Sequence, residues 1–340
     1  MNRFIILLVI FFCGFIKAEE ETRVLIIGNS YTFYNDLPEL IQAIADADGH
    51  PMKVDSYTAG AMSLRGFLNS PQHAAAAQKL AIGHYDWLIL QEQSQMPSSN
   101  PEETIASVRR WSELARAQRT RTMLFLTWAH AAVENGQMTL QTAMQNDTSL
   151  TYCRAAAETN SRVAPVGEAW RRWYRKYPTR PLHQNDLSHP TPEGTYLAAC
   201  VIYSSLTGKQ ATSIPVRLRN SPVRISAPRA RDLQKIAAQT LRGFSPARYI
   251  SQREEQDKAL PSADDVRAML TRNMTISQLT EKIGRPHLTQ RNDNQVTYQF
   301  RLRGQAELVA YCNTRGKIQQ ISMHSPSTGV TIIDLAELEH

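Results

Sequence analysis

Short, fully apolar runs alternate with longer amphipathic stretches from Val24 to about Gly208. The first run, residues 24–27, contains no polar residue, which is typical of a strand buried in the middle of a parallel sheet. Further strands are predicted at 52–57, 87–91, 122–128 and 163–166, and helices at 37–47, about 74–80, 102–119, 140–160, 167–174 and 191–206. Strands that alternate with helices in this way predict an α/β fold around a central parallel sheet.

The composition changes after this α/β region. Residues 246–261 are polar and charged, which favours a linker, and a further helix at 232–242 is expected to pack on the first domain. Beyond the linker the pattern predicts a short helix at 276–283 and strands at 295–302, 306–312 and 317–323. The predicted division is a signal peptide at 1–18, a catalytic domain at 19–245, a linker at 246–261 and a small α+β module at 262–340.

The first 18 residues have the pattern of a secretory signal. A basic residue near the start precedes an apolar core at 4–12, and the small residue Ala18 stands before two acids. The apolar core is shorter than the roughly 20 residues of a membrane span. We therefore expect cleavage near Ala18 and a periplasmic or secreted protein, with lipid attachment at Cys13 as the alternative.

Three cysteines remain after such a cleavage: Cys153, Cys200 and Cys312. In an oxidising compartment Cys153 and Cys200 could form a bridge, and three separate buried thiols are the other interpretation. No cysteine or histidine cluster has the spacing of zinc ligands, so neither a metal nor a cofactor is expected.

The net charge of the chain is +7, and it falls to +5 without residues 1–18, which hold two basic residues and no acid. The remaining basic residues form only local clusters, without interleaved aromatic residues or a nucleic-acid motif. This distribution argues against nucleic-acid binding. It leaves open a weak attraction to anionic polysaccharide or to lipid head groups.

Candidate catalytic residues stand at two distant places in the chain. Ser30 directly follows the first predicted strand, at the edge where open α/β sheets bind ligands. Asp186 and His189 lie three residues apart in an irregular polar loop. At this spacing the carboxylate can reach the ring Nδ1 while the other ring nitrogen faces the serine, which predicts a Ser-His-Asp triad.

These residues resemble the sequence blocks of the SGNH or GDSL-type hydrolases over about residues 22–208. Gly28-Asn29-Ser30 is similar to the first block, residues 59–64 to the second, and Asp186-x-x-His189 to the last. The resemblance implies a flavodoxin-like three-layer fold in which Ser30 is the nucleophile and His189 the general base, oriented by Asp186. It also implies that the backbone N–H groups of Ser30 and Gly60 form part of an oxyanion hole.

The third block departs from the family pattern. The family usually has Gly-x-Asn-Asp there, whereas this chain has Gln91-Glu92-Gln93-Ser94-Gln95. A glutamine amide can replace the asparagine as a donor, and we predict Gln93 for this role with Gln91 and Gln95 as alternatives. A similar Gln-rich block occurs in branches that resemble carbohydrate acetylesterases.

The expected function is an exported serine esterase that removes an acetyl or another small acyl group from a saccharide. One alternative is a lipase or thioesterase of the same family. Another is an envelope-binding protein with a vestigial hydrolase domain. The module at 262–340 has no candidate catalytic residues, and we expect it to contact an envelope component or to support the esterase. Its helix at 276–283 resembles, loosely, those of small envelope-lipoprotein and β-lactamase-inhibitor-like modules.

Three other aromatic or histidine residues stand near the predicted site elements in the sequence. Trp128 and His130 follow the fourth predicted strand, where Trp128 is expected to pack and His130 is a candidate for substrate contact. His183 precedes the predicted triad loop residues but has no acid at the matching spacing.

Overall fold

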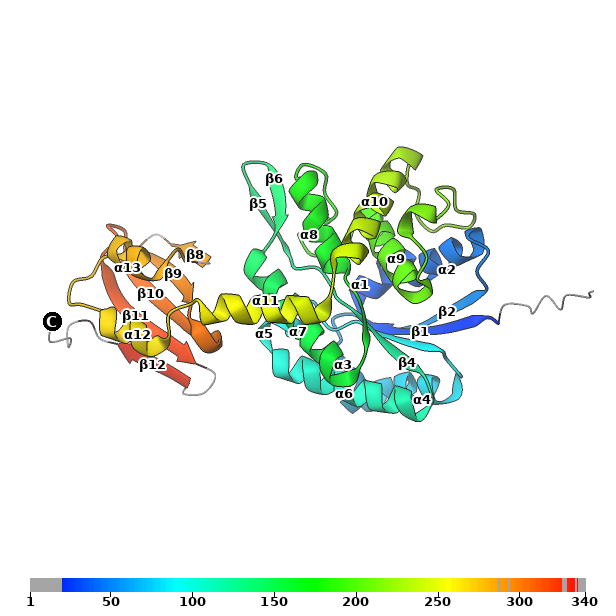
Figure 1. Ribbon diagram of the computed structural model, residues 1–340, viewed down its shortest axis with the longest axis horizontal. Coiled ribbons are helices and arrows are strands. Elements are labelled where there is room, and N and C mark those ends of the chain that lie inside the picture. The colour runs from blue at the N-terminus through cyan, green and yellow to red at the C-terminus, as the bar shows by residue number, and fades with distance from the viewer. Residues whose placement is uncertain (1–19, 287, 293, 326–328, 334, 336–340) are drawn as a thin grey trace, which may run out of the picture.

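The computed structural model describes residues 20–340, except 287, 293, 326–328, 334 and 336–340 (Figure 1). The predicted signal peptide and the alternative lipid attachment at Cys13 lie outside the described residues. Within the described part, no helix is long and apolar enough to span a membrane.

A five-stranded sheet forms the centre of the larger part of the molecule. Its strands are β1 (Thr22–Gly28), β2 (Met52–Thr58), β3 (Trp87–Leu90), β4 (Arg121–Phe125) and β7 (Arg162–Ala164). They run parallel in the order β2-β1-β3-β4-β7, which is the flavodoxin-like order. The predicted α/β fold is confirmed, and the carboxyl end of β1 places Ser30 at the ligand-binding edge of the sheet.

Helices cover both faces of this sheet. Successive residues of a strand point to opposite sides, and the strand residues on both sides are apolar and need a helical layer to bury them. Val24 and Ile26 belong to one buried cluster, and Leu25 and Ile27 belong to the other. The first cluster packs against α2 (Leu37–Ala47), α8 (Val166–Lys176), α9 (Pro192–Thr207) and α10 (Ala227–Gly243). The second packs against α3 (Leu64–Asn69), α4 (Ala74–Ile82), α6 (Pro101–Ala117) and α7 (Thr142–Thr159) (Figure 1).

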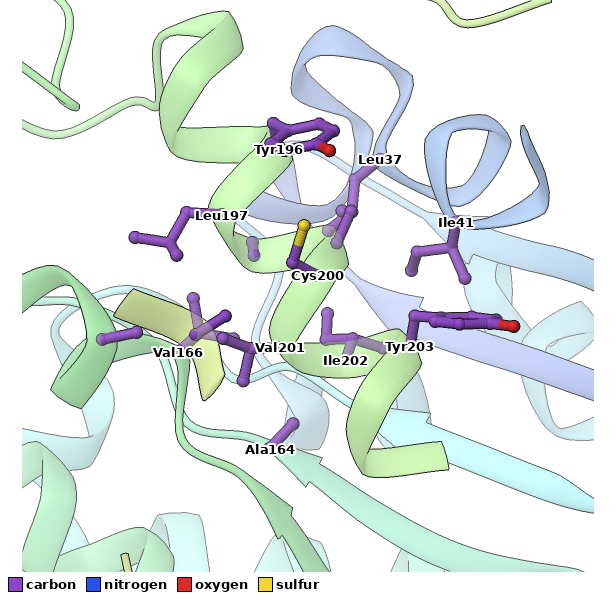
Figure 2. Packing of buried hydrophobic residues seen from close by; sticks show 14 of the residues in the cluster. Leu37, Ile41, Ala164, Val166, Tyr196, Leu197, Cys200, Val201, Ile202 and Tyr203 are labelled. Atoms are coloured by element: carbon purple, nitrogen blue, oxygen red, sulfur yellow. The ribbon is translucent and has the colours of Figure 1, made fainter. Parts of the chain in front are cut away.

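Helix α9 is buried along most of its length. Leu197, Val201 and Ile202 are fully buried within the cluster that also holds Leu37 and Ala164 (Figure 2). Cys200 lies on the same helix, whereas Cys153 lies on α7, at the opposite face of the sheet. The suggested Cys153–Cys200 bridge is wrong, and the other interpretation is confirmed: all three described cysteines are buried free thiols.

Several elements were not predicted from the sequence. Strands β5 (Ala131–Glu134) and β6 (Gln137–Leu140) form an antiparallel hairpin after β4. Other unpredicted elements are short helices: α5 (Met96–Ser99), η1 (Tyr34–Asp36), η2 (Pro71–His73), η3 (Ala211–Ser213) and η4 (Arg303–Gln305). Helix α1 (Ser30–Phe33) begins at Ser30, as expected for the nucleophile position. The segment predicted as a linker is the helix α11 (Pro246–Lys258), capped by the Ser245 side chain. None of its residues is buried, so its polar composition reflects an exposed helix.

The C-terminal part has a sheet and a core of its own. Helices α12 (Ala263–Met269) and α13 (Ile276–Ile283) precede the antiparallel strands β8 (Leu288–Arg291), β9 (Gln295–Arg301), β10 (Glu307–Asn313), β11 (Ile318–Ser325) and β12 (Gly329–Ile333). The strand order β12-β11-β10-β9-β8 is that of a simple meander. Arg301 of β9 forms a 2.6 Å ion pair with Asp147 of α7, which connects this sheet to the larger domain.

Candidate active site

Ser30, His189 and Asp186 lie together at the carboxyl end of β1. Ser30 opens helix α1 immediately after the strand, and its Oγ is 2.9 Å from Nε2 of His189. The other ring nitrogen of His189, Nδ1, is 2.6 Å from Oδ2 of Asp186. The structure thus brings the three predicted residues into one continuous hydrogen-bonded chain.

The loop that carries Asp186 holds its carboxylate in place. Oδ1 accepts the backbone N–H groups of Ser188 at 3.0 Å and His189 at 2.9 Å. Leu187, between them, has a φ of +60°, a left-handed conformation that a branched side chain seldom adopts. Burial alone would raise the pKa of Asp186, but hydrogen bonds from Ser188 and His189 outweigh it and lower the pKa to about 2. The carboxylate is therefore ionised at neutral pH.

Aromatic rings position the imidazole and its loop. Tyr34 stacks on the ring of His189 with a centroid distance of 4.2 Å, and Tyr31 meets the same ring edge-on at 5.9 Å. Tyr31 also stacks on Trp128, and both bond to Ser188: the Tyr31 hydroxyl to its Oγ at 2.8 Å and the Trp128 Nε1–H to its carbonyl at 3.0 Å. Trp128 is 1% exposed, so the prediction that it packs is confirmed.

Two further contacts tie the triad loop to its surroundings. Nδ2 of Asn35 donates to the carbonyl of Pro190 at 3.0 Å, which links the nucleophile segment to the His189 loop. The backbone N–H of Ala131, at the start of the unpredicted hairpin, donates to the carbonyl of Leu187 at 2.8 Å. Neither contact could be found from sequence spacing, because each joins segments that are far apart in the chain.

Gln91 is a structural residue beneath the nucleophile. Its Oε1 accepts the Asn29 N–H at 2.8 Å and the Thr32 hydroxyl at 2.9 Å, and its Nε2 donates to Asn29 Oδ1 and to the carbonyl of Glu92. A Cβ at Gly28 would lie 2.5 Å from Gln91 Oε1, so this position requires glycine. Both amide hydrogens of Gln91 are occupied, so this alternative for the oxyanion donor is wrong.

Three donors remain at the positions predicted for an oxyanion hole. The backbone N–H groups of Ser30 and Gly60 have no hydrogen-bond acceptor within the described part of the chain. Gln93 Oε1 accepts the N–H groups of Gln95 at 2.8 Å and Met96 at 3.1 Å. These two bonds fix the amide plane of Gln93 and leave its Nε2 hydrogens available. Gln95, the other alternative, has an exposed side chain.

Glu92 is a residue of the site that the sequence analysis did not assign. Its side chain is buried, and Oε1 accepts the backbone N–H groups of Leu64 at 2.9 Å and Gln93 at 2.7 Å. One carboxyl group thus joins the segment after Gly60 to the segment that carries Gln93. Burial raises the pKa of Glu92 to about 7, against the opposing effect of these two hydrogen bonds.

The pKa of Glu92 predicts a pH dependence of stability. The folded chain keeps a proton on this carboxyl up to about pH 7, whereas the unfolded chain releases it near the reference value of 4.5. The contribution of Glu92 to the free energy of unfolding is therefore full below about pH 4.5. It decreases as the pH rises to about 7, by up to roughly 3 kcal/mol.

Glu92→Gln is expected to remove this part of the pH dependence. Urea unfolding at pH 5 and pH 8 gives the free energy of unfolding of the wild type and of the variant. The decrease in this free energy from pH 5 to pH 8 should be smaller in the variant. Glu134→Gln, which removes an exposed carboxyl from the hairpin, is the matched control. An equal decrease in the free energy of unfolding in wild type and Glu92→Gln would contradict the raised pKa of Glu92 as its source.

The two other histidines near the triad differ in their surroundings. His183 is buried, its Nε2 donates to the carbonyl of Ala129 at 3.1 Å, and its Nδ1 accepts the Tyr174 hydroxyl at 2.8 Å. Burial lowers its pKa to about 4, so His183 is neutral and structural. Burial also lowers the pKa of His130, which lies close enough to Asp186 and His189 for their charges to affect it. Its Nε2 is buried and has no hydrogen-bond partner in the described part of the chain.

No cluster of three or more His, Cys, Asp or Glu side chains that could hold a metal ion occurs among the described residues.

Comparison with protein-family models and with curated proteins finds no match. Among solved structures, a DUF4886 family protein from Bacteroides uniformis is similar over 66% of this chain and 96% of its own length, with 18% identity and a TM-score of 0.52. A putative SGNH hydrolase from Slackia heliotrinireducens is 25% identical over 55% of this chain and 100% of its own, with a TM-score of 0.47.

This chain shares its fold with the DUF4886 family protein. An acetylxylan esterase from Geobacillus stearothermophilus is among the other similar structures, with 12% identity over 56% of this chain and 96% of its own, and a TM-score of 0.45. In the comparisons with the Slackia and Geobacillus proteins, the similar region covers little more than half of this chain.

Proposed function

We propose that this protein is a serine esterase that hydrolyses a small acyl ester, with acetyl as the expected group, on a saccharide. The observation that carries the proposal is the chain of contacts from Ser30 Oγ through His189 to Asp186, with distances of 2.9 and 2.6 Å. A serine hydroxyl becomes a good nucleophile when a neutral imidazole accepts its proton, and the ionised Asp186 keeps the imidazole in the required tautomer.

In the proposed reaction, Ser30 Oγ attacks the ester carbonyl while Nε2 of His189 takes the hydroxyl proton. The N–H groups of Ser30 and Gly60 and the amide of Gln93 stabilise the negative oxygen of the tetrahedral intermediate. Each such donor contributes about 3–4 kcal/mol in the transition state. His189 then protonates the departing alcohol, which leaves an acyl-Ser30 ester. Water attacks this ester with His189 again as base, and the carboxylic acid and free Ser30 are released.

An aromatic pair next to the triad, with Phe33 exposed and Tyr34 half-buried, supports a saccharide substrate. Phe33 is 41% exposed, and its ring lies 5.8 Å from that of Tyr34, which itself stacks on His189. A sugar ring can place its C–H face on such rings while its ester reaches Ser30. The Gln-rich third block favours sugar esters as well. An apolar acyl chain could use the same rings, so the lipase or thioesterase alternative requires a direct test.

Turnover of esters with acyl chains of increasing length distinguishes a small-acyl saccharide esterase from a lipase or thioesterase. We expect kcat/KM to fall from p-nitrophenyl acetate to p-nitrophenyl octanoate, and an acetylated xylooligosaccharide to be deacetylated. Phe33→Ala should raise KM for the oligosaccharide several-fold and change p-nitrophenyl acetate hydrolysis little. A preference for octanoate, together with the loss of that preference in Phe33→Ala, would favour the lipase or thioesterase alternative.

The proposal also places the enzyme in the periplasm or outside the cell, on the basis of the signal pattern of residues 1–18. The C-terminal module is proposed to contact an envelope component. Its separate core supports an independent unit, because the buried residues of this module form a cluster of their own.

A further inference from the structure

A basic cleft lies at the amino-terminal edge of the central sheet, opposite the edge that carries Ser30. It is lined by the first residues of three strands, Trp87 of β3, Arg121 of β4 and Arg162 of β7, and by residues that follow α6 and α7. Its volume is about 440 Å³, and four of its lining residues are arginines: Arg116, Arg119, Arg121 and Arg162. No acidic residue lines it.

Two of these arginines are held against one aromatic ring. The guanidinium of Arg121 lies 4.1 Å from the centroid of Trp87, and that of Arg162 lies 4.8 Å from it. Arg162 Nη1 also donates to the carbonyl of Ser205 at 2.6 Å. Burial lowers the pKa of Arg162, and the positive charge of Arg121 lowers it further. The two like charges are thus kept close together by packing.

The charge of the cleft is not balanced by its surroundings. None of the four arginines forms an ion pair with a carboxylate of the described residues. Helices α6 and α7 end beside the cleft, and each C-terminus contributes only about half a negative charge. The neighbouring Asp86 accepts the backbone N–H of Arg23 and is a further negative charge near the cleft. With both helix ends and Asp86 counted, about two positive charges remain.

A buried hydroxyl in the same cleft also lacks a partner. Ser112 lines the cleft and is 3% exposed, and its Oγ makes no hydrogen bond within the described part of the chain. Buried polar groups are normally hydrogen-bonded, so an unpartnered hydroxyl beside converging guanidinium groups is consistent with a ligand that brings acceptor oxygens. Guanidinium groups bind phosphate oxygens in a bidentate geometry.

We propose that this cleft binds a phosphate-bearing anion, either a soluble phosphorylated molecule or the headgroup of an anionic lipid. Strand β1 begins at Thr22, and in a parallel sheet its start lies at this same edge. The cleft therefore lies on the side of the sheet where β1 begins, and Ser30 lies at the opposite edge. The proposal is independent of the esterase activity.

The test uses two probes, inorganic pyrophosphate in calorimetry and sedimentation with vesicles of phosphatidylglycerol or of phosphatidylcholine alone. The cleft variant is Arg116→Gln/Arg121→Gln. The control is Arg217→Gln/Arg219→Gln, which removes the same charge from exposed positions outside the cleft. Thermal melting of each variant checks that it is folded.

We expect the wild type to bind pyrophosphate, the cleft variant to bind at least about tenfold more weakly, and the control to stay within about twofold. Binding to phosphatidylglycerol vesicles that is lost only in the cleft variant identifies a lipid headgroup, and binding of pyrophosphate alone identifies a soluble ligand. Equal weakening in both double variants, or no binding to either probe, would overturn the proposal.

Discussion

Ser30→Ala is expected to lower kcat for p-nitrophenyl acetate by about a millionfold while the chain remains folded. The change removes the hydroxyl that lies 2.9 Å from His189 Nε2, and the carbonyl then has no nucleophile. The fold should persist because the change deletes one oxygen at a position that is not fully buried. Steady-state kinetics and a urea melt measure both effects.

Covalent labelling gives the matched control for this prediction. A fluorophosphonate should modify Ser30 in the wild type and no residue in Ser30→Ala. Ser188 is a second serine of the site, but its Oγ bonds to the Tyr31 hydroxyl, so Ser188→Ala should keep both labelling and most of the activity. Modification of Ser188, or activity that survives in Ser30→Ala, would show that the nucleophile is another group.

Asp186→Asn is expected to lower kcat by about ten-thousandfold. The amide oxygen can still accept the N–H groups of Ser188 and His189, so the loop should keep its shape. The amide NH₂ then faces Nδ1 of His189, which favours the tautomer that carries its hydrogen on Nε2. That tautomer cannot accept the proton of Ser30.

Asp36→Asn serves as the control for the loss of a carboxylate near Ser30. Asp36 is exposed and its side chain makes no capping hydrogen bond, so this variant should retain nearly full kcat. A decrease of less than about tenfold in Asp186→Asn would contradict the role of the carboxylate in holding the tautomer.

Local signals in the sequence were sufficient for the sheet, for most helices and for the candidate triad. Residues 24–27 are apolar on both faces because β1 lies between two strands and two helical layers. Helix α2 was predicted with its observed bounds, since Pro38 suits a first turn and Gly49 follows its end. Asp186 and His189 are three residues apart, so a local turn alone can bring the carboxylate to Nδ1.

Tertiary structure decided everything that depends on which distant segments meet. The sequence could not separate Gln91 from Gln93, because their difference is that Gln91 packs beneath Asn29 while Gln93 is held by its own loop. It left a bridge between Cys153 and Cys200 open, since nothing in the helical pattern shows on which face of the sheet a helix lies. Glu92 was passed over for the same reason: its partner Leu64 is a backbone N–H, which has no sequence signature.

The residue types and their local spacing thus determined the secondary structure and the chemistry available to this chain. Hydrophobic burial and backbone hydrogen bonds between remote segments decided which of those groups face each other, and these interactions depend on the whole fold. The basic cleft illustrates the division: Arg116 and Arg121 are close in the chain, but only the parallel sheet places Arg162 and Trp87 beside them.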